Sequence, residues 1–154
     1  MEVRPWQIVA LATLCFIQAL HHLETGLSAV LEGSNHSNVV ELAESGIGGD
    51  DVNAVYEHLD ITADVFGLLA VVTIMFGILL YRGQYLPAVR LTGTIYSAIG
   101  VIGLFFVTGS TDEGTIGATS NDNLFQLLFT ILLLAGFVSL FFGKSAKWVN
   151  EHRN

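Results

Sequence analysis

The sequence is short of charged residues, and long stretches of it hold none. Only 13% of its 154 residues are Asp, Glu, Lys or Arg, whereas 52% are hydrophobic. Soluble domains usually carry about a quarter charged residues. The low charge, together with a mean hydropathy of +0.60, argues against a soluble protein and predicts an integral membrane protein.

The sequence also lacks features on which several other functions depend. Its six Lys and Arg residues form no basic patch to neutralise phosphates, so we expect no nucleic-acid partner. The Gly-rich segment 46–49 has no P-loop lysine and follows no strand. The single cysteine, Cys15, forms no disulfide within the chain, and an apolar helix disfavours its thiolate. We therefore predict a protein that is not an enzyme.

Long uncharged runs are the main positive signal. About 18 apolar residues are enough to cross the hydrocarbon core as a helix. The runs predict an all-α protein, a single transmembrane domain over residues 1–154 built as a four-helix bundle. The predicted helices cover about residues 5–31, 52–81, 87–108 and 123–143, and the predicted outer loops cover about residues 32–51 and 109–122.

Individual residues predict where some of these helices begin and end. Asp50 and Asp51 are candidate caps for the second helix, and Asp122 or Asn123 is a candidate cap for the fourth. Gly143 predicts the end of the fourth helix, with an amphipathic tail after it. A short helical piece is expected over Val39–Glu44 in the first outer loop.

The basic residues predict the orientation of the helices. All six fall on one side of a four-helix arrangement: Arg4, Arg82, Arg90, Lys144, Lys147 and Arg153. The positive-inside rule therefore places the N-terminus, the middle loop and the C-terminus in the cytoplasm of a multi-pass cell-membrane protein. The net charge of −8 is carried almost wholly by the outer loops. Such a surface suits a halophilic archaeon, and the alternative is a surface that gathers cations.

Small residues recur at helical spacing, and the two halves of the chain resemble each other. The stripe in the second helix consists of Ala63, Gly67, Ala70, Thr73 and Gly77, and the stripe in the third consists of Gly93, Ser97, Gly100 and Gly103. Small residues let membrane helices pack closely, which favours a close bundle. Residues 64–69 (DVFGLL) resemble residues 123–128 (NLFQLL), so we expect the two hairpins to be parallel repeats.

A family resemblance follows from the last two-thirds of the chain. The chain resembles the DUF4383 group in its two inside-to-outside hairpins and in the Gly-rich outer end of its third helix. It also resembles that group in Arg90 and Tyr96 of the third helix and in the opening of the fourth helix at 122–125 (DNLF). That family tends to carry a His in the first turns of helices two and four, where this chain has Gly67 and Gln126. The resemblance implies a small four-helix membrane protein and no particular activity.

Polar residues gather near the predicted outer ends of the helices. Cys15, Gln18, His22 and Thr25 are spaced i, i+3, i+7 and i+10, which places them on one face of the first helix. The other polar residues at this depth are His21, Glu24, His58, Asp60, Asp64, Asp122, Gln126 and Thr130.

Imidazole and carboxylate groups together bind Zn²⁺ or Cu²⁺, or relay protons. The candidate metal ligands are His21, His22, His58 and Asp64. In the alternative interpretation, these groups reach water at the membrane interface and stabilise helix ends. That interpretation is favoured, because no ligand spacing here is diagnostic of a metal.

These observations leave three functions open. The first is a non-catalytic membrane protein without a cofactor, which associates with itself or serves as an accessory subunit of a membrane complex. Its partners would be the lipid bilayer and other membrane subunits. The second is a protein that binds or transports a cation or proton through the outer polar cluster. The third is a membrane enzyme or redox subunit, for which haem would need two facing histidines at matching depth.

Overall fold

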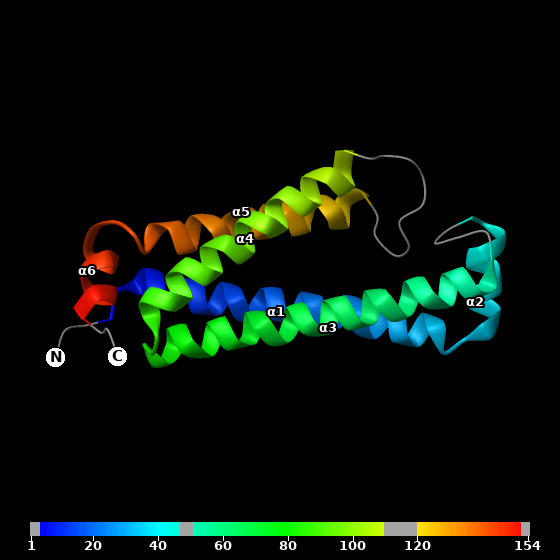
Figure 1. Ribbon diagram of the computed structural model, residues 1–154, viewed down its shortest axis with the longest axis horizontal. Coiled ribbons are helices and arrows are strands. Elements are labelled where there is room, and N and C mark those ends of the chain that lie inside the picture. The colour runs from blue at the N-terminus through cyan, green and yellow to red at the C-terminus, as the bar shows by residue number, and fades with distance from the viewer. Residues whose placement is uncertain (1–3, 47–50, 110–119, 152–154) are drawn as a thin grey trace.

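The protein is helical throughout the part of the chain that the structure describes. The computed structural model describes residues 4–46, 51–109 and 120–151 and contains no strand within them. The fold class predicted from the sequence, all-α, is confirmed for these residues. Six helices are present: α1 Trp6–Gly33, α2 His36–Glu44, α3 Val52–Arg82, α4 Leu86–Gly109, α5 Ser120–Ser139 and α6 Gly143–Glu151 (Figure 1).

Three of these helices are long and apolar enough to cross a membrane. They are α1, α3 and the Leu86–Leu104 part of α4. A fourth span is possible if α5 and α6 are taken together, although the two are bent by 66° at the break between them. The described residues therefore give three or four candidate spans, which is consistent with a membrane protein.

The start of α3 follows the sequence prediction. Its N-cap is Asp51, whose carboxylate accepts a hydrogen bond from the backbone N–H of Asn53 at 3.3 Å. At the other end, Gly83 adopts the left-handed conformation (φ 71°) that closes many helices. The predicted short helix in the first loop is also present, and it begins earlier than expected, at His36.

The fourth predicted helix differs most from expectation. We expected it to run from about residue 123 to Gly143, but α5 covers Ser120–Ser139 and α6 begins at Gly143. The N–H groups of residues 140, 141 and 142 each bond to the carbonyl three residues earlier, at 3.2, 3.0 and 3.2 Å. This tightening ends α5, and the left-handed Gly143 (φ 63°) redirects the chain into α6.

The long helices pair into two hairpins, α1 with α3 and α4 with α5. Glycines mark the close approach within each pair. A Cβ on Gly26 of α1 would lie 3.4 Å from the carbonyl oxygen of Ala63 in α3. A Cβ on Gly93 of α4 would lie 2.3 Å from the ring of Phe137 in α5. The predicted role of small residues in close helix packing is therefore realised inside both hairpins.

The two hairpins meet near α6 and separate toward α2 (Figure 1). Apolar packing follows the same division into two clusters. The cluster that we call the α6-end core contains Ile8, Leu11, Ala12, Cys15, Leu80, Leu86, Val89, Leu133, Phe137, Leu140, Trp148 and Val149. The cluster that we call the α2-end core contains Ala29, Val39, Val55 and Leu59. Among the side chains that the structure describes, every helix except α2 contributes to the first core, whereas α1, α2 and α3 alone contribute to the second.

Candidate functional site

The four predicted metal ligands lie on α1 and α3 but differ in their surroundings. His22 is buried, His21 and His58 are half-buried, and Asp64 is exposed. The ring of His22 faces Phe66 of α3, with centroids 5.6 Å apart. Asp64 is two residues away from Phe66, which is about 200° around the helix, so the two side chains point in different directions.

The described residues contain no group of three or more His, Cys, Asp or Glu side chains arranged to hold a metal ion. The proposed ligand set of His21, His22, His58 and Asp64 therefore stays a prediction from the sequence. Of the remaining polar residues considered with that set, Asp60 is exposed. The side chain of Asp122 lies outside the described part of the structure.

The polar stripe predicted on α1 is real and faces the interior. Cys15, Gln18 and His22 are all buried. Thr25, the fourth member, is half-buried and donates its hydroxyl to the carbonyl of His21 at 3.1 Å. Their spacing keeps them on the same side of the helix as the apolar residues that pack against α3 and α5. Polar groups therefore reach well into the candidate span.

Gln18 and His22 form a hydrogen-bonded pair on this stripe. Nε2 of Gln18 lies 3.3 Å from Nε2 of His22. An amide nitrogen only donates, so the imidazole nitrogen accepts, and a neutral His22 carries its proton on Nδ1. Nδ1 of His22 and Oε1 of Gln18 are both buried and have no hydrogen-bond partner among the described residues. The pair thus presents one donor and one acceptor, each costing about 1–3 kcal/mol while unpaired.

A second polar contact joins the hairpins closer to their middle. The hydroxyls of Thr73 in α3 and Tyr96 in α4 lie 3.1 Å apart, and Thr73 also donates to the carbonyl of Leu69 at 2.6 Å. The ring of Tyr96 packs edge-on against Phe76, which packs in the same way against Phe137. The sequence had marked Thr73 only as a small residue and Tyr96 only through the family resemblance. The pairing depends on the rotation of two helices, which spacing along either helix does not reveal.

Basic residues near α6 bind backbone carbonyls and aromatic rings. The guanidinium of Arg4 donates to the carbonyl of Tyr81 and lies 5.8 Å from the ring of Tyr81 and 5.7 Å from that of Trp148. Arg90 donates to the carbonyl of Leu140 at 3.4 Å and lies 4.3 Å from the ring of Phe141. Sequence reasoning used these arginines for topology, and Arg90 also for the family resemblance, and missed their contacts with backbone carbonyls and aromatic rings at the helix ends.

Comparison with protein-family models, with curated proteins and with solved structures finds no match to this chain. The resemblance to the DUF4383 group therefore stays a prediction from the sequence. Function has to be argued from the geometry of the helices and of their buried polar groups.

Proposed function

We propose that the protein is a small, non-catalytic membrane protein that associates with a second copy of itself or with another subunit of a membrane complex. The observation that carries this proposal is a contrast between two kinds of glycine. Gly26, Gly93 and Gly136 sit against neighbouring helices, where an added Cβ would lie within 3.4 Å of another atom. Gly67 and Gly103 have no atom of the described residues within 4 Å of an added Cβ.

The open glycines suit a partner helix. Glycine in a helix interior costs about 1 kcal/mol relative to alanine, and membrane helices use small residues where another helix approaches closely. Gly67 lies 15 residues before the end of α3, and Gly103 lies 17 residues after the start of α4. The two are therefore at similar heights above the turn that joins α3 to α4, in the region where the hairpins are apart (Figure 1).

The proposed topology has four spans with both termini in the cytoplasm. In this arrangement α5 is the fourth span, and α6 lies across the cytoplasmic end. The exposed aromatic residues Trp6, Tyr81 and Tyr85 at this end support it, because tryptophan and tyrosine concentrate at the membrane interface. The distribution of all six basic residues supports the same orientation. The α2 end, with its acidic neighbours, would then face outside.

The proposal is tested by purifying the protein in mild detergent and measuring its molar mass by light scattering, with mass spectrometry of co-purifying chains. We expect a homo-oligomer or a stoichiometric partner. Gly67→Leu and Gly103→Leu should each lower the associated fraction about tenfold, whereas Ala88→Leu, at an exposed position of α4, should leave it unchanged. Because leucine meets no neighbour at either glycine and favours helix, folding should be retained. A monomer without any partner would contradict the proposal.

A second candidate function, binding or relay of a cation or proton, is favoured by the Gln18–His22 pair. A buried imidazole beside an unpaired amide oxygen offers a polar site inside an otherwise apolar span. Calorimetry with Zn²⁺ and Cu²⁺, on the native protein and on His22→Gln, separates the two candidates. Binding that His22→Gln abolishes, with unchanged association, would favour this function. His36→Gln, at an exposed histidine outside the candidate ligand set, is the matched control.

A further inference from the structure

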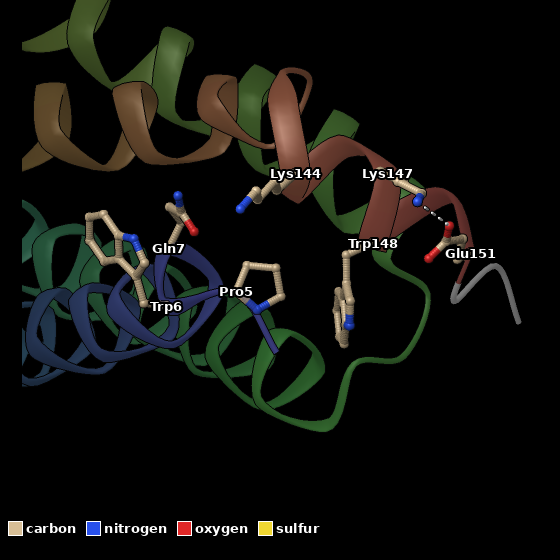
Figure 2. Close-up of a pocket in the computed structure, with 7 residues that line it drawn as sticks. All are labelled: Pro5, Trp6, Gln7, Lys144, Lys147, Trp148 and Glu151. Carbon is tan, nitrogen blue, oxygen red and sulfur yellow. Dashed lines mark ion pairs between the residues drawn. The ribbon is translucent and has the colours of Figure 1, made fainter. Parts of the chain in front are cut away.

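A pocket of about 630 Å³ opens between the start of α1 and the exposed side of α6. Trp6 and Gln7 of α1 line it opposite four residues of α6: Lys144, Lys147, Trp148 and Glu151 (Figure 2). Its volume lies within the range of small-ligand sites, about 300–1,000 Å³. It lies at the end of the molecule away from the Gln18–His22 pair, and the proposed function makes no use of it.

The charges of this pocket suit a singly charged anion. Among the described residues, two ammonium groups and one carboxylate line it, which leaves one net positive charge. Lys147 is already paired with Glu151 at 3.7 Å. Lys144 extends from α6 to the other side of the pocket, toward Gln7 (Figure 2), and has no carboxylate at ion-pair distance among the described residues. Lys144 is therefore the principal cation available to a ligand.

The remaining features of the pocket suit the surface of a bilayer. Trp6 is 74% exposed at its rim, and exposed Val9 continues the apolar surface along α1. The α6 helix is bent by 66° from α5, buries Trp148 and Val149, and exposes both lysines. The apolar side of α6 therefore packs against the protein, and its two lysines point outward, where the anionic lipids of a cytoplasmic leaflet would attract them.

We propose that this pocket binds the phosphate of an anionic phospholipid headgroup in the cytoplasmic leaflet. Lys144 pairs with the phosphate, the amide of Gln7 donates to it, and Trp6 packs against the glycerol and upper acyl chain. The apolar rim selects a lipid over a soluble phosphate, because a soluble anion gains nothing from Trp6 and Val9. The inference rests on the proposed topology, which places this end of the molecule at the cytoplasmic surface.

The two tryptophans of the chain are Trp6 and Trp148, and both line the pocket, so intrinsic fluorescence reports on it directly. The full-length protein in phosphatidylcholine micelles is titrated with brominated phosphatidylglycerol or brominated phosphatidylcholine, which quench tryptophan on contact. We expect the anionic lipid to quench at a lower mole fraction. Lys144→Gln should reduce this preference about fivefold, because the phosphate loses its direct ion-pair partner in addition to one charge at the surface.

Two further variants complete the test. Arg82→Gln removes one exposed positive charge at the same end but outside the pocket, and should keep the preference within about twofold of the native value. Glu151→Gln removes the carboxylate that occupies Lys147 and should strengthen the preference. Circular dichroism shows whether Lys144→Gln folds. If it does not, the stronger lipid preference of Glu151→Gln still tests the inference independently.

Three outcomes would overturn the inference. Equal quenching by both brominated lipids would leave the topology intact but remove the headgroup site. Inorganic phosphate and unbrominated phosphatidylglycerol can each be tested as competitors of the brominated phosphatidylglycerol. If inorganic phosphate competes equally well, the pocket is a site for a soluble anion. No quenching by either lipid would contradict both the site and the proposed position of α6 at the membrane.

Discussion

The two ends of the molecule are built in different ways. At the α6 end, five helices contribute to one buried core, and arginine side chains close it by binding backbone carbonyls and aromatic rings. At the α2 end, the core is a small cluster from α1, α2 and α3, and none of the side chains described in α4 and α5, which exclude residues 105–125, belongs to it. The difference indicates that the four long helices act as one body near α6 and as two hairpins toward α2.

The largest expected effect comes from breaking the α6-end core. Phe137→Ala removes a fully buried ring that lies over Gly93 and against Phe76. The cavity should lower the free energy of unfolding by about 3 to 5 kcal/mol. Unfolding in a detergent–SDS mixture, followed by tryptophan fluorescence, measures this. Val138→Ala, at a 38% exposed neighbour, should change it by less than about 0.5 kcal/mol.

A smaller and more local effect is expected at the α2 end. Leu59→Ala removes a buried side chain of the α2-end core and should cost about 2 to 3 kcal/mol of local stability. Hydrogen exchange followed by mass spectrometry should show faster exchange in α2 and in the adjoining turns of α1 and α3. Faster exchange in α4 and α5 as well would contradict the separation of the two ends.

The N-cap of α3 offers a third test at the same end. Asp51→Ala removes the carboxylate that accepts a hydrogen bond from the backbone N–H of Asn53 and should cost about 1 kcal/mol. Thermal unfolding monitored by circular dichroism measures the change. Asp60→Ala, at an exposed position inside the same helix, should stay within about 0.5 kcal/mol of the native protein.

The smallest expected effect concerns the Thr73–Tyr96 contact between the hairpins, which tests how far from α6 the two hairpins stay in contact. A double-mutant cycle of Thr73→Val and Tyr96→Phe should give a coupling of about 0.6 kcal/mol, typical of hydrogen bonds between membrane helices. Thr92→Val with Tyr96→Phe is the control, because the hydroxyl of Thr92 is exposed and bonded within its own helix. A coupling no larger than that of the control would place the junction closer to α6.

Much of the helical framework could be predicted from composition alone. Uncharged runs bounded by residues such as Asp51 locate α1, α3 and α4 within a few residues of their observed ends. The break between α5 and α6 was not predicted, because the run from 124 to 143 stays apolar across it. Gly143 was expected to end the fourth helix, but it begins α6, and the hydrogen bonds of residues 140–142 place the end of the preceding helix at Ser139.

The candidate site was predictable along one helix but not between helices. The spacing of Cys15, Gln18 and His22 predicted a shared face, and these residues are buried together. Depth in the membrane suggested Asp64 as a neighbour of His22, but the rotation of α3 brings Phe66 to that place. Periodicity shows which residues of one helix share a face, whereas the residue opposite depends on how two helices are turned toward each other.

The contact of Arg4 with Tyr81 and Trp148 has a consequence for synthesis of the chain. One guanidinium joins the beginning of the first span, the end of the second span and the last helix. During translation, the α1–α3 hairpin can form while later residues are still in the ribosome, but this contact is complete only once α6 has emerged. A chain halted before α6 would lack Trp148 and Val149, the residues that α6 contributes to the α6-end core. Membrane proteases that recognise unassembled helices would therefore distinguish a finished molecule from a truncated one at this end.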